Sequence, residues 1–301
     1  MAGDQAALAA VSLSCDEEGV REPKDKVIVI TGAAGGIGRA LALHGARLGM
    51  RVVLSDIDAA RLEQTVAEVE ALGAEAIGVR ADVGSAESVA KLADAAYARF
   101  GAVHVLVNNA GIAASGAAWK VPLEMWERTL RINLDGVVFG IHAFVPRMLA
   151  GGEPGHIVNV ASAAGLVTTP GFAAYSASKF AVVGLSEALY YDLKLRKTAI
   201  GVSLLCPAWV KTDIASSEHA AVATDDPFDA MVEASVRKAV SKGIPAAEVA
   251  EQVFAAIEND KFYIITHPET LTAHIHRADD IANGRDPQLP TFERRPSQAS
   301  S

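Results

Sequence analysis

Apolar residues follow two alternating patterns along the chain from Lys26 onward. Short runs rich in valine and isoleucine are typical of strands buried on both faces, and longer segments with an apolar residue every three or four positions are typical of amphipathic helices. The predicted strands are the runs KVIVIT, RVVLS, AEAIGVR, VHVLVN, GHIVNVAS, AIGVSLLC and KFYIIT. Segments such as DAARLEQTVAEVEALG and AAEVAEQVFAAIEND are the predicted helices between them.

This alternation predicts an α/β fold. Consecutive strand–helix–strand units pair their strands in parallel through right-handed crossovers and place helices on both faces of the sheet. We therefore expect a Rossmann-type, doubly wound domain with a mainly parallel seven-stranded sheet, formed by residues 25–285. No change in composition marks a linker within this range, so a single domain is expected.

Three segments do not follow the alternation. Residues 1–24 predict a flexible N-terminal extension, and residues 286–301 predict a disordered C-terminal tail. The region of about 211–245 is long, mixed in composition and weakly periodic. Because long loops within compact domains are usually functional or disordered, we interpret this region as a substrate loop.

Composition and charge narrow the class of protein. The chain has 301 residues, half of them hydrophobic, and a formal net charge of −9 without a basic block. This balance argues against nucleic acid or an anionic membrane as the main partner, and no apolar run is long enough to indicate a membrane span. The two cysteines, Cys15 and Cys206, suggest neither a disulfide framework nor a metal site, so we expect a cytoplasmic protein without a metal.

A glycine cluster lies between the first predicted strand and the first predicted helix. The stretch VIVITGAAGGIGRAL contains Gly32, Gly35, Gly36 and Gly38. Glycines allow a tight turn and close approach of the backbone, and the helix N-terminus offers free N–H groups to a pyrophosphate. The strand before the cluster and the helix after it favour a dinucleotide site over a plain turn.

Asp56 ends the second predicted strand, where a carboxylate can accept hydrogen bonds from both hydroxyls of an adenosine ribose. The same carboxylate would repel a 2′-phosphate, so NAD is favoured over NADP. Asp56 could instead cap the next helix, although Asp58 could serve that role equally well. Arg39 is a nearby cation and keeps NADP open as an alternative.

The stretch YSASK places Tyr175 and Lys179 four residues apart in a predicted helix, so that both side chains lie on one face. A cation close to a phenol favours the phenolate and lowers the phenol pKa towards neutral pH. The pair is therefore a candidate general acid/base with its activating cation. The alternative is a half-exposed helix face with a solvated lysine.

Several motifs together resemble the short-chain dehydrogenase/reductase family. The glycine loop has the spacing T-G-x-x-x-G-x-G from Thr31, NNAG begins at Asn108, and YSASK has the form Y-x-x-x-K. CPAWVKT is similar to the family's P-G-x-V-x-T, with Ala208 in place of glycine. These motifs occur along the chain in the same order as in the family. The resemblance implies a small-molecule alcohol or ketone substrate of apolar character and a homotetramer or homodimer.

The resemblance also implies four catalytic residues. Ser162 would hold the substrate oxygen, and Tyr175 would act as general acid/base. Lys179 would lower the Tyr175 pKa together with the oxidised nicotinamide, and would bind the nicotinamide ribose. Asn133 would hold a water in a proton relay. Independently, Asn133 is a poor mid-helix residue beside Gly136, which indicates a local distortion of a predicted long helix.

The residues implied to contact the cofactor are spread over the same motifs. They are Gly32, Gly36, Ile37, Gly38, Asp56, Ile57, Asp82, Val83, Asn109, Ala110, Gly111, Tyr175, Lys179, Pro207, Val210 and Thr212. Asp82 and Val83 would border the adenine ring, and Thr212 would bind the carboxamide of the nicotinamide.

These features predict an NAD(H)-dependent oxidoreductase that interconverts a secondary alcohol and a ketone. One alternative is an NADPH-dependent carbonyl or 3-oxoacyl reductase, and another is a catalytically inactive dinucleotide-binding or sensing protein. A flavodoxin-like nucleotide module would lack the Ser-Tyr-Lys set. The segments FVPRML, PGHIVNV and FYIITHPE also resemble family members that oxidise benzylic or other bulky secondary alcohols.

The substrate pocket is less clearly marked in the sequence. Trp209, Phe172, Trp119 and the loop after Thr212 are candidates to line an apolar pocket, although such residues belong more often to the core or to an interface. Three histidines, His267, His274 and His276, are interpreted as surface residues and not as a metal site.

Overall fold

The computed structural model describes residue 20, residues 22–215 and residues 226–291. Seven strands form one sheet, and two shorter strands form a second. The strands are β1 Val27–Thr31, β2 Arg51–Asp56, β3 Ala76–Arg80, β4 Val105–Asn108, β5 Gly155–Val160, β6 Ile200–Cys206, β7 Val210–Lys211, β8 Ile244–Pro245 and β9 Tyr263–Ile265. The cysteine at position 15 and most of the predicted N-terminal extension lie outside the described residues.

The helices of the described residues separate these strands. They are α2 Gly36–Arg47, α3 Ala59–Ala71, α4 Ala86–Phe100, α5 Leu123–Leu130, α6 Gly136–Gly151, α7 Ala173–Leu195, α8 Pro227–Ser241, α9 Ala246–Glu258 and α10 Glu269–Ala282. Short helical turns are η1 Arg131–Asp135, η2 Ala163–Gly165 and η3 Asp213–Ala215.

The large sheet has the strand order β3-β2-β1-β4-β5-β6-β9, and every neighbouring pair is parallel. The predicted doubly wound, seven-stranded sheet is confirmed. The order reverses between β1 and β4, which is the point where the crossovers turn to opposite sides. In open sheets of this kind, the crevice that binds ligands lies at the carboxyl ends of the two strands at this point.

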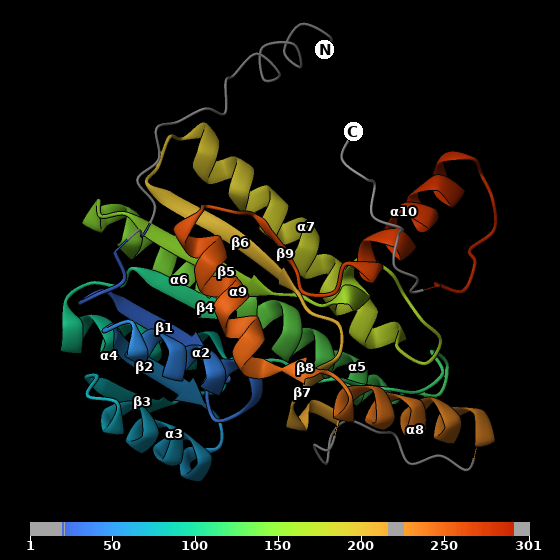
Figure 1. Ribbon diagram of the computed structural model, residues 1–301, viewed down its shortest axis with the longest axis horizontal. Helices are drawn as coiled ribbons and strands as arrows, with labels where there is room; N and C mark the ends of the chain where they lie inside the picture. Colours follow the sequence, from blue (N-terminus) through green and yellow to red (C-terminus); the bar gives the residue numbers. More distant parts are fainter. Residues whose placement is uncertain (1–19, 21, 216–225, 292–301) are drawn as a thin grey trace, which may run out of the picture.

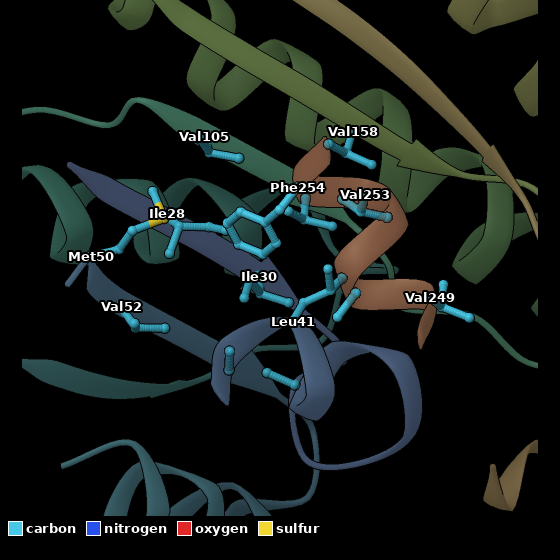
Figure 2. Close-up of a cluster of buried hydrophobic side chains, with 14 of the residues drawn as sticks. Ile28, Ile30, Leu41, Met50, Val52, Val105, Val158, Val249, Val253 and Phe254 are labelled. Atoms are coloured by element: carbon cyan, nitrogen blue, oxygen red, sulfur yellow. The ribbon is translucent and has the colours of Figure 1, made fainter. Parts of the chain in front are cut away.

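Helices cover both faces of the sheet (Figure 1). On one face α2, α3 and α9 pack on the sheet, and α4, α6 and α7 cover the other face. Figure 2 shows the first core, where Phe254 and Val253 of α9 meet Ile28 and Ile30 of β1. The strands β1, β2, β4, β5 and β6 are buried on both faces, which explains why their sequences read as continuous apolar runs, whereas the edge strands β3 and β9 are partly exposed.

The longest helical run passes from α5 through η1 into α6. Leu123–Gly151 is long and apolar enough to cross a membrane by length and composition alone. In this fold Phe144, Val145 and Met148 of the run are buried in the second core against α4. The run is therefore a core helix of the domain.

The predicted substrate loop of 211–245 contains regular structure. Asp226 caps α8 by accepting a hydrogen bond from the Phe228 N–H at 2.9 Å, and Pro227 occupies the first helical position. Because α8 has only two buried residues, its helical periodicity is weak in the sequence. Val20, in the predicted N-terminal extension, is buried against the first core.

His156 is fully buried in β5, at the edge of the sheet opposite the crevice. Its Nε2 lies 2.8 Å from Ser203 Oγ, and its Nδ1 lies 3.8 Å from Asp260 Oδ1. Burial lowers the His156 pKa from 6.5 to about 4, Asp260 acts in the opposite direction, and Lys194 adds to the lowering. The imidazole is therefore neutral in the folded protein at physiological pH.

This burial predicts a pH-dependent stability. The unfolded chain binds a proton at His156 below pH 6.5, whereas the folded chain binds it only near pH 4. Stability is therefore lost progressively as the pH falls from 6.5 to 4. We expect the free energy of unfolding to fall by on the order of 3 kcal/mol across this window. Chemical denaturation at each pH measures it.

The variant His156→Asn should flatten that part of the profile whatever its effect on stability at pH 7. His142→Asn, at an exposed position of α6, is the control for replacing a histidine. Equal slopes for wild type and His156→Asn between pH 4 and 6.5 would contradict the assignment.

Candidate active site

The glycine loop is built against the end of β4. The Thr31 hydroxyl accepts hydrogen bonds from the backbone N–H groups of Asn109 and Ala110 at 3.0 and 3.1 Å. The Asn109 amide donates to the carbonyls of Thr31 and Gly32 at 2.8 and 3.1 Å. Gly32 has a φ of 66°, and a Cβ there would lie 2.8 Å from Ala110 Cα. Glycine is therefore required where the loop meets β4.

The rest of the loop leads into α2. A Cβ on Gly38 would overlap the Gly32 carbonyl, and a Cβ on Gly36 would lie 3.1 Å from Thr212 Cγ2. The N-cap residue of α2 is Gly35, which has no side chain to bond the first N–H groups of the helix. These N–H groups and the positive end of the helix dipole suit a phosphate.

Asp56 faces this loop from the end of β2. Its Oδ2 accepts from Ala34 N and its Oδ1 from Asp58 N, both at 3.0 Å. The cap of α3 is Asp58, which accepts from Arg61 N at 3.1 Å. Of the two aspartates that the sequence offered for this cap, Asp56 is therefore the one left beside the loop, and its oxygens keep further acceptor capacity.

Two arginines lie near the loop. Arg39, the cation that kept NADP open, is bound by Glu68 through Nε and Nη2 at 2.6 and 2.7 Å. The motif comparison did not single out Arg61, whose Nη2 lies 2.7 Å from Asp213 Oδ2. A Cβ on Gly35 would lie 2.6 Å from this nitrogen. Arg61 thus passes across the glycine loop from α3 to η3.

The remaining predicted cofactor contacts lie along the same edge of the sheet. Ile57 follows β2 and is 57% exposed. Asp82 Oδ1 accepts from a backbone N–H two residues on at 2.9 Å, so it also shapes the turn into α4, and Val83 is buried beside it. Pro207 and Val210 follow β6 and line the cavity described below.

Asn133 lies in a π-helical turn, Arg131–Asp135, between α5 and α6. The distortion predicted beside Gly136 is confirmed. The buried Asn133 amide accepts from Ile112 N at 2.8 Å and donates to Ile112 O and Ser178 Oγ at 2.9 and 3.0 Å. It therefore ties the loop after β4 to α7, and both of its protons are used.

Lys179 reaches from α7 to the end of β5. Its Nζ donates to Val160 O at 2.8 Å, and the residue is only 3% exposed. A Cβ on Gly165 would lie 2.7 Å from Lys179 O, so η2 and α7 can pack this closely only at a glycine. A Cβ on Gly111 would lie 3.5 Å from Lys179 Nζ and 3.2 Å from Asn133 Oδ1, which places these two polar groups around one point. Motif comparison did not single out Gly165.

Ser162 and Tyr175 lie together beyond the end of β5. Ser162 Oγ accepts from Ala164 N at 3.1 Å and donates to Pro207 O at 3.3 Å. Ser162 and Tyr175 line the same cavity, and the Ser162 hydroxyl is near enough to the phenol to lower the Tyr175 pKa. Lys179 Nζ lies 5.7 Å from the Tyr175 ring centroid. The four residues with predicted catalytic roles are thus gathered at one edge of the sheet.

The Tyr175 pKa differs from the sequence expectation. Burial raises the pKa of the phenol in the chain itself, and the Ser162 hydroxyl acts in the opposite direction. Burial also lowers the Lys179 pKa to about 8. In the chain without a cofactor, burial outweighs any effect of Lys179 on the Tyr175 pKa, because it disfavours the charged form of both groups. The expectation that Lys179 and a bound oxidised nicotinamide together lower this pKa stays a prediction.

A cavity of about 270 Å³ opens beside Ser162 and Tyr175. Its apolar lining includes Ile37, Val167, Phe172, Trp209, Val236 and Val240. The expectation for Trp209 and Phe172 is confirmed. Trp119 is 85% exposed and does not line this cavity, so that expectation is wrong.

The three histidines near the C-terminus lie in different surroundings. His267 lines the cavity, and burial lowers its pKa, so it is not a plain surface residue as expected. His274 is partly buried, with Nδ1 3.3 Å from Leu166 O, and His276 is exposed. Within residues 20, 22–215 and 226–291 there is no cluster of three or more His, Cys, Asp or Glu side chains that could hold a metal.

The crevice fits a dinucleotide. The glycine loop leaves a side-chain-free cradle beside the N-terminus of α2, and Asp56 offers carboxylate oxygens next to it. The cavity and the Ser162–Tyr175 pair lie farther along the same edge, after β5 and β6.

Comparison with known proteins agrees with this arrangement. The family model described as short chain dehydrogenase matches residues 26–223. The chain belongs to the short-chain dehydrogenase family. It is 39% identical over 259 residues to a CLA biosynthesis dehydrogenase/reductase of Lactiplantibacillus plantarum, covering 83% of this chain and 91% of that protein.

Solved structures of short-chain dehydrogenases are similar to this one over most of its length. A short-chain dehydrogenase/reductase from Burkholderia phymatum in complex with NAD superposes with a TM-score of 0.86 at 44% identity, over 90% of this chain and 99% of that one. The apo form of LigD from Sphingobium sp. strain SYK-6 gives a TM-score of 0.74 at 31% identity, over 88% and 99%. The chain is thus an oxidoreductase-family protein with a Rossmann-like fold.

The burial of Lys179 predicts that this lysine lowers the stability of the short-chain dehydrogenase when no cofactor is bound. Its pKa is about 8 in the folded chain against an ordinary 10.5. The energetic cost is therefore complete below pH 8 and disappears as the pH rises to 10.5. Lys179→Met removes this cost and also the hydrogen bond to Val160 O, so the free energy of unfolding at pH 7 should rise by about 1–3 kcal/mol. The gain should vanish near pH 10.5.

Lys194→Met is the matched control, because Lys194 is also buried but its Nζ is paired with Asp260 at 3.0 Å. Removing one partner of a buried pair is destabilising. The two lysine variants should therefore shift thermal unfolding in opposite directions at pH 7. A loss of stability in Lys179→Met comparable to that in Lys194→Met would contradict the argument.

Proposed function

We propose that this protein is an NAD-dependent dehydrogenase that interconverts a secondary alcohol and a ketone. The observation that carries the proposal is the placement of Ser162 and Tyr175 together on the wall of one largely apolar cavity, with Lys179 Nζ 5.7 Å from the Tyr175 ring centroid. A hydroxyl that can hold an oxygen and a phenol that can exchange a proton are the groups this reaction needs. The apolar lining suits a substrate with a hydrocarbon body.

Each residue has a separate task in this proposal. Ser162 donates a hydrogen bond to the carbonyl or alcohol oxygen and fixes its position. Tyr175 exchanges the proton with that oxygen. Because burial keeps Tyr175 protonated in the chain, the phenol is ready to donate a proton to a ketone oxygen, which is the direction of reduction. When bound, the nicotinamide supplies or takes up the hydrogen at the carbinol carbon.

Lys179 and Asn133 support the proton transfer from behind Tyr175. The Lys179 ammonium favours the phenolate form when the alcohol is the substrate, and its lowered pKa lets it pass a proton on. Both amide protons of Asn133 are used, so its contribution is the remaining acceptor capacity of Oδ1, beside Lys179 Nζ.

The glycine loop and Asp56 would hold NAD. The loop would take the pyrophosphate at the N-terminus of α2, and Asp56 would accept the ribose hydroxyls. The engagement of Arg39 by Glu68 also favours NAD, because it neutralises one cation that could receive a 2′-phosphate. The Burkholderia phymatum relative was crystallised with NAD.

The other expectations follow from the same proposal. An NADPH-dependent carbonyl or 3-oxoacyl reductase is the second enzyme candidate. Its 2′-phosphate could be met by Arg61, which crosses the glycine loop, although Asp213 pairs with this arginine as Glu68 does with Arg39. A cytoplasmic location and a homotetramer or homodimer stay predictions from the sequence.

Tyr175→Phe tests the central assignment. The variant loses only the hydroxyl, so NAD should bind with unchanged affinity while turnover of secondary alcohols falls by a factor on the order of 10² to 10⁴. Calorimetric titration measures binding, and absorbance of the reduced nicotinamide measures turnover with a panel of secondary alcohols. Near-full activity of the variant would rule out the assignment.

Asp56→Ala tests the preference for NAD. Without the carboxylate, the repulsion of a 2′-phosphate disappears and Arg61 remains at the loop, so kcat/KM with NADP relative to NAD should rise by about tenfold or more. Asp58→Ala is the control, since it removes a neighbouring carboxylate that caps α3. An unchanged cofactor ratio in Asp56→Ala would count against the role of Asp56.

A further inference from the structure

A second group of polar side chains lines the cavity, apart from Ser162 and Tyr175. It comes from the segment between β9 and α10 and consists of His267, Glu269 and Thr270. This segment follows the region that matches the family model. None of these three residues has a task in the proposed proton transfer.

Two atoms of this group are buried and have no hydrogen-bond partner among the described residues. They are Glu269 Oε2 and Thr270 Oγ1, and Thr270 is fully buried. The third member, His267, has its Nδ1 2.7 Å from Thr266 Oγ1, and burial lowers its pKa against the influence of Glu269. A neutral imidazole does not neutralise the Glu269 carboxylate.

Buried polar atoms without partners are destabilising, so each one needs an explanation. Both residues line the cavity, and a rotation of either side chain would turn its oxygen towards a ligand there, which could then supply the missing partner. A carboxylate oxygen only accepts hydrogen bonds, so the ligand group must be a donor. The other charged side chains of the cavity wall, Glu233 and Arg237, form an ion pair with each other.

We propose that the substrate carries a hydrogen-bond donor, a hydroxyl or an ammonium group, separated by an apolar body from the carbon that reacts, and that Glu269 Oε2 and Thr270 Oγ1 bind this donor. The inference rests on the proposed function, since the reacting end of the substrate is placed at Ser162 and Tyr175. Apolar residues such as Phe172, Trp209 and Val236 would enclose the body between the two polar ends.

A series of alcohols of graded length tests the inference with NAD and the wild-type protein. Each 2-alkanol from hexan-2-ol to nonan-2-ol is compared with the diol that has a second hydroxyl at its far end, from hexane-1,5-diol to nonane-1,8-diol. At the length that spans the two polar ends, the diol should exceed its alkanol in kcat/KM by about tenfold. In a purely apolar cavity the buried second hydroxyl would instead weaken every diol.

The 8-aminooctan-2-ol arm distinguishes the two kinds of donor. If the donor is an ammonium group, the amino alcohol exceeds octane-1,7-diol, and if it is a hydroxyl group, the order is reversed.

Variants of the two acceptors localise the effect. Glu269→Met should reduce the diol-to-alkanol ratio to about one, and Glu269→Gln, which keeps an acceptor oxygen, should retain part of it. Glu248→Met is the matched control, because Glu248 also lies in the first turn of a helix, α9, but is exposed and outside the cavity wall. Its ratio should equal that of the wild type.

Thr270→Val provides a readout independent of activity. Because the Thr270 hydroxyl has no partner in the protein, the isosteric valine should keep or raise the melting temperature while it lowers the ratio. A lower melting temperature would show a structural partner for this hydroxyl and overturn its part in the proposal.

The alcohol series distinguishes a wrong proposed function from a wrong assignment of Glu269 and Thr270. If no alcohol of the series is oxidised but NAD binds, the proposed function is wrong. If alkanols are oxidised while every diol and the amino alcohol are poorer substrates, the proposed function stands and the inference about Glu269 and Thr270 is wrong.

Discussion

The ammonium group of Lys179 is buried at the carboxyl end of β5, where Nζ donates a 2.8 Å hydrogen bond to Val160 O. A buried cation is stable only where its hydrogen bonds are supplied, so this contact fixes α7 against the sheet. The approach is possible because Gly165 leaves room for the Lys179 backbone. The same helix turn carries Tyr175, and the chain from β5 to η2 carries Ser162. The position of the lysine thus determines the geometry of the whole pair.

The electrostatic consequence is that burial disfavours charge on both partners. It raises the Tyr175 pKa and lowers the Lys179 pKa to about 8. In water the two groups titrate close together near pH 10. In the chain itself the neutral phenol is favoured, and the lysine gives up its proton more readily than in water. In the proposed function, these pKa values would let the site exchange a proton with the substrate without leaving a permanent buried charge.

Much of this arrangement could be predicted from the sequence because it depends on local patterns. Valine and isoleucine runs predicted the parallel strands, and Asn133 beside Gly136 predicted a local helix distortion, which the structure shows to be a π-helical turn. Properties that depend on burial could not be predicted. The sign of the Tyr175 pKa shift depends on its surroundings, and the exposure of Trp119 depends on which side of the chain faces solvent. The sequence DDPF contains the cap and proline that begin α8, but the weak periodicity after it concealed the helix.

The division of the chain explains why family membership leaves the substrate open. The family model ends at residue 223 and includes Ser162, Tyr175 and Lys179. Part of the cavity wall lies beyond it, on α8 and on the segment that begins α10. Proton exchange requires groups at fixed positions on the sheet edge, whereas substrate selection requires only that a wall of suitable shape and polarity faces them. Val236, Glu269 and Thr270 line this outer part of the cavity wall, so the proposal about the substrate rests on their physical character.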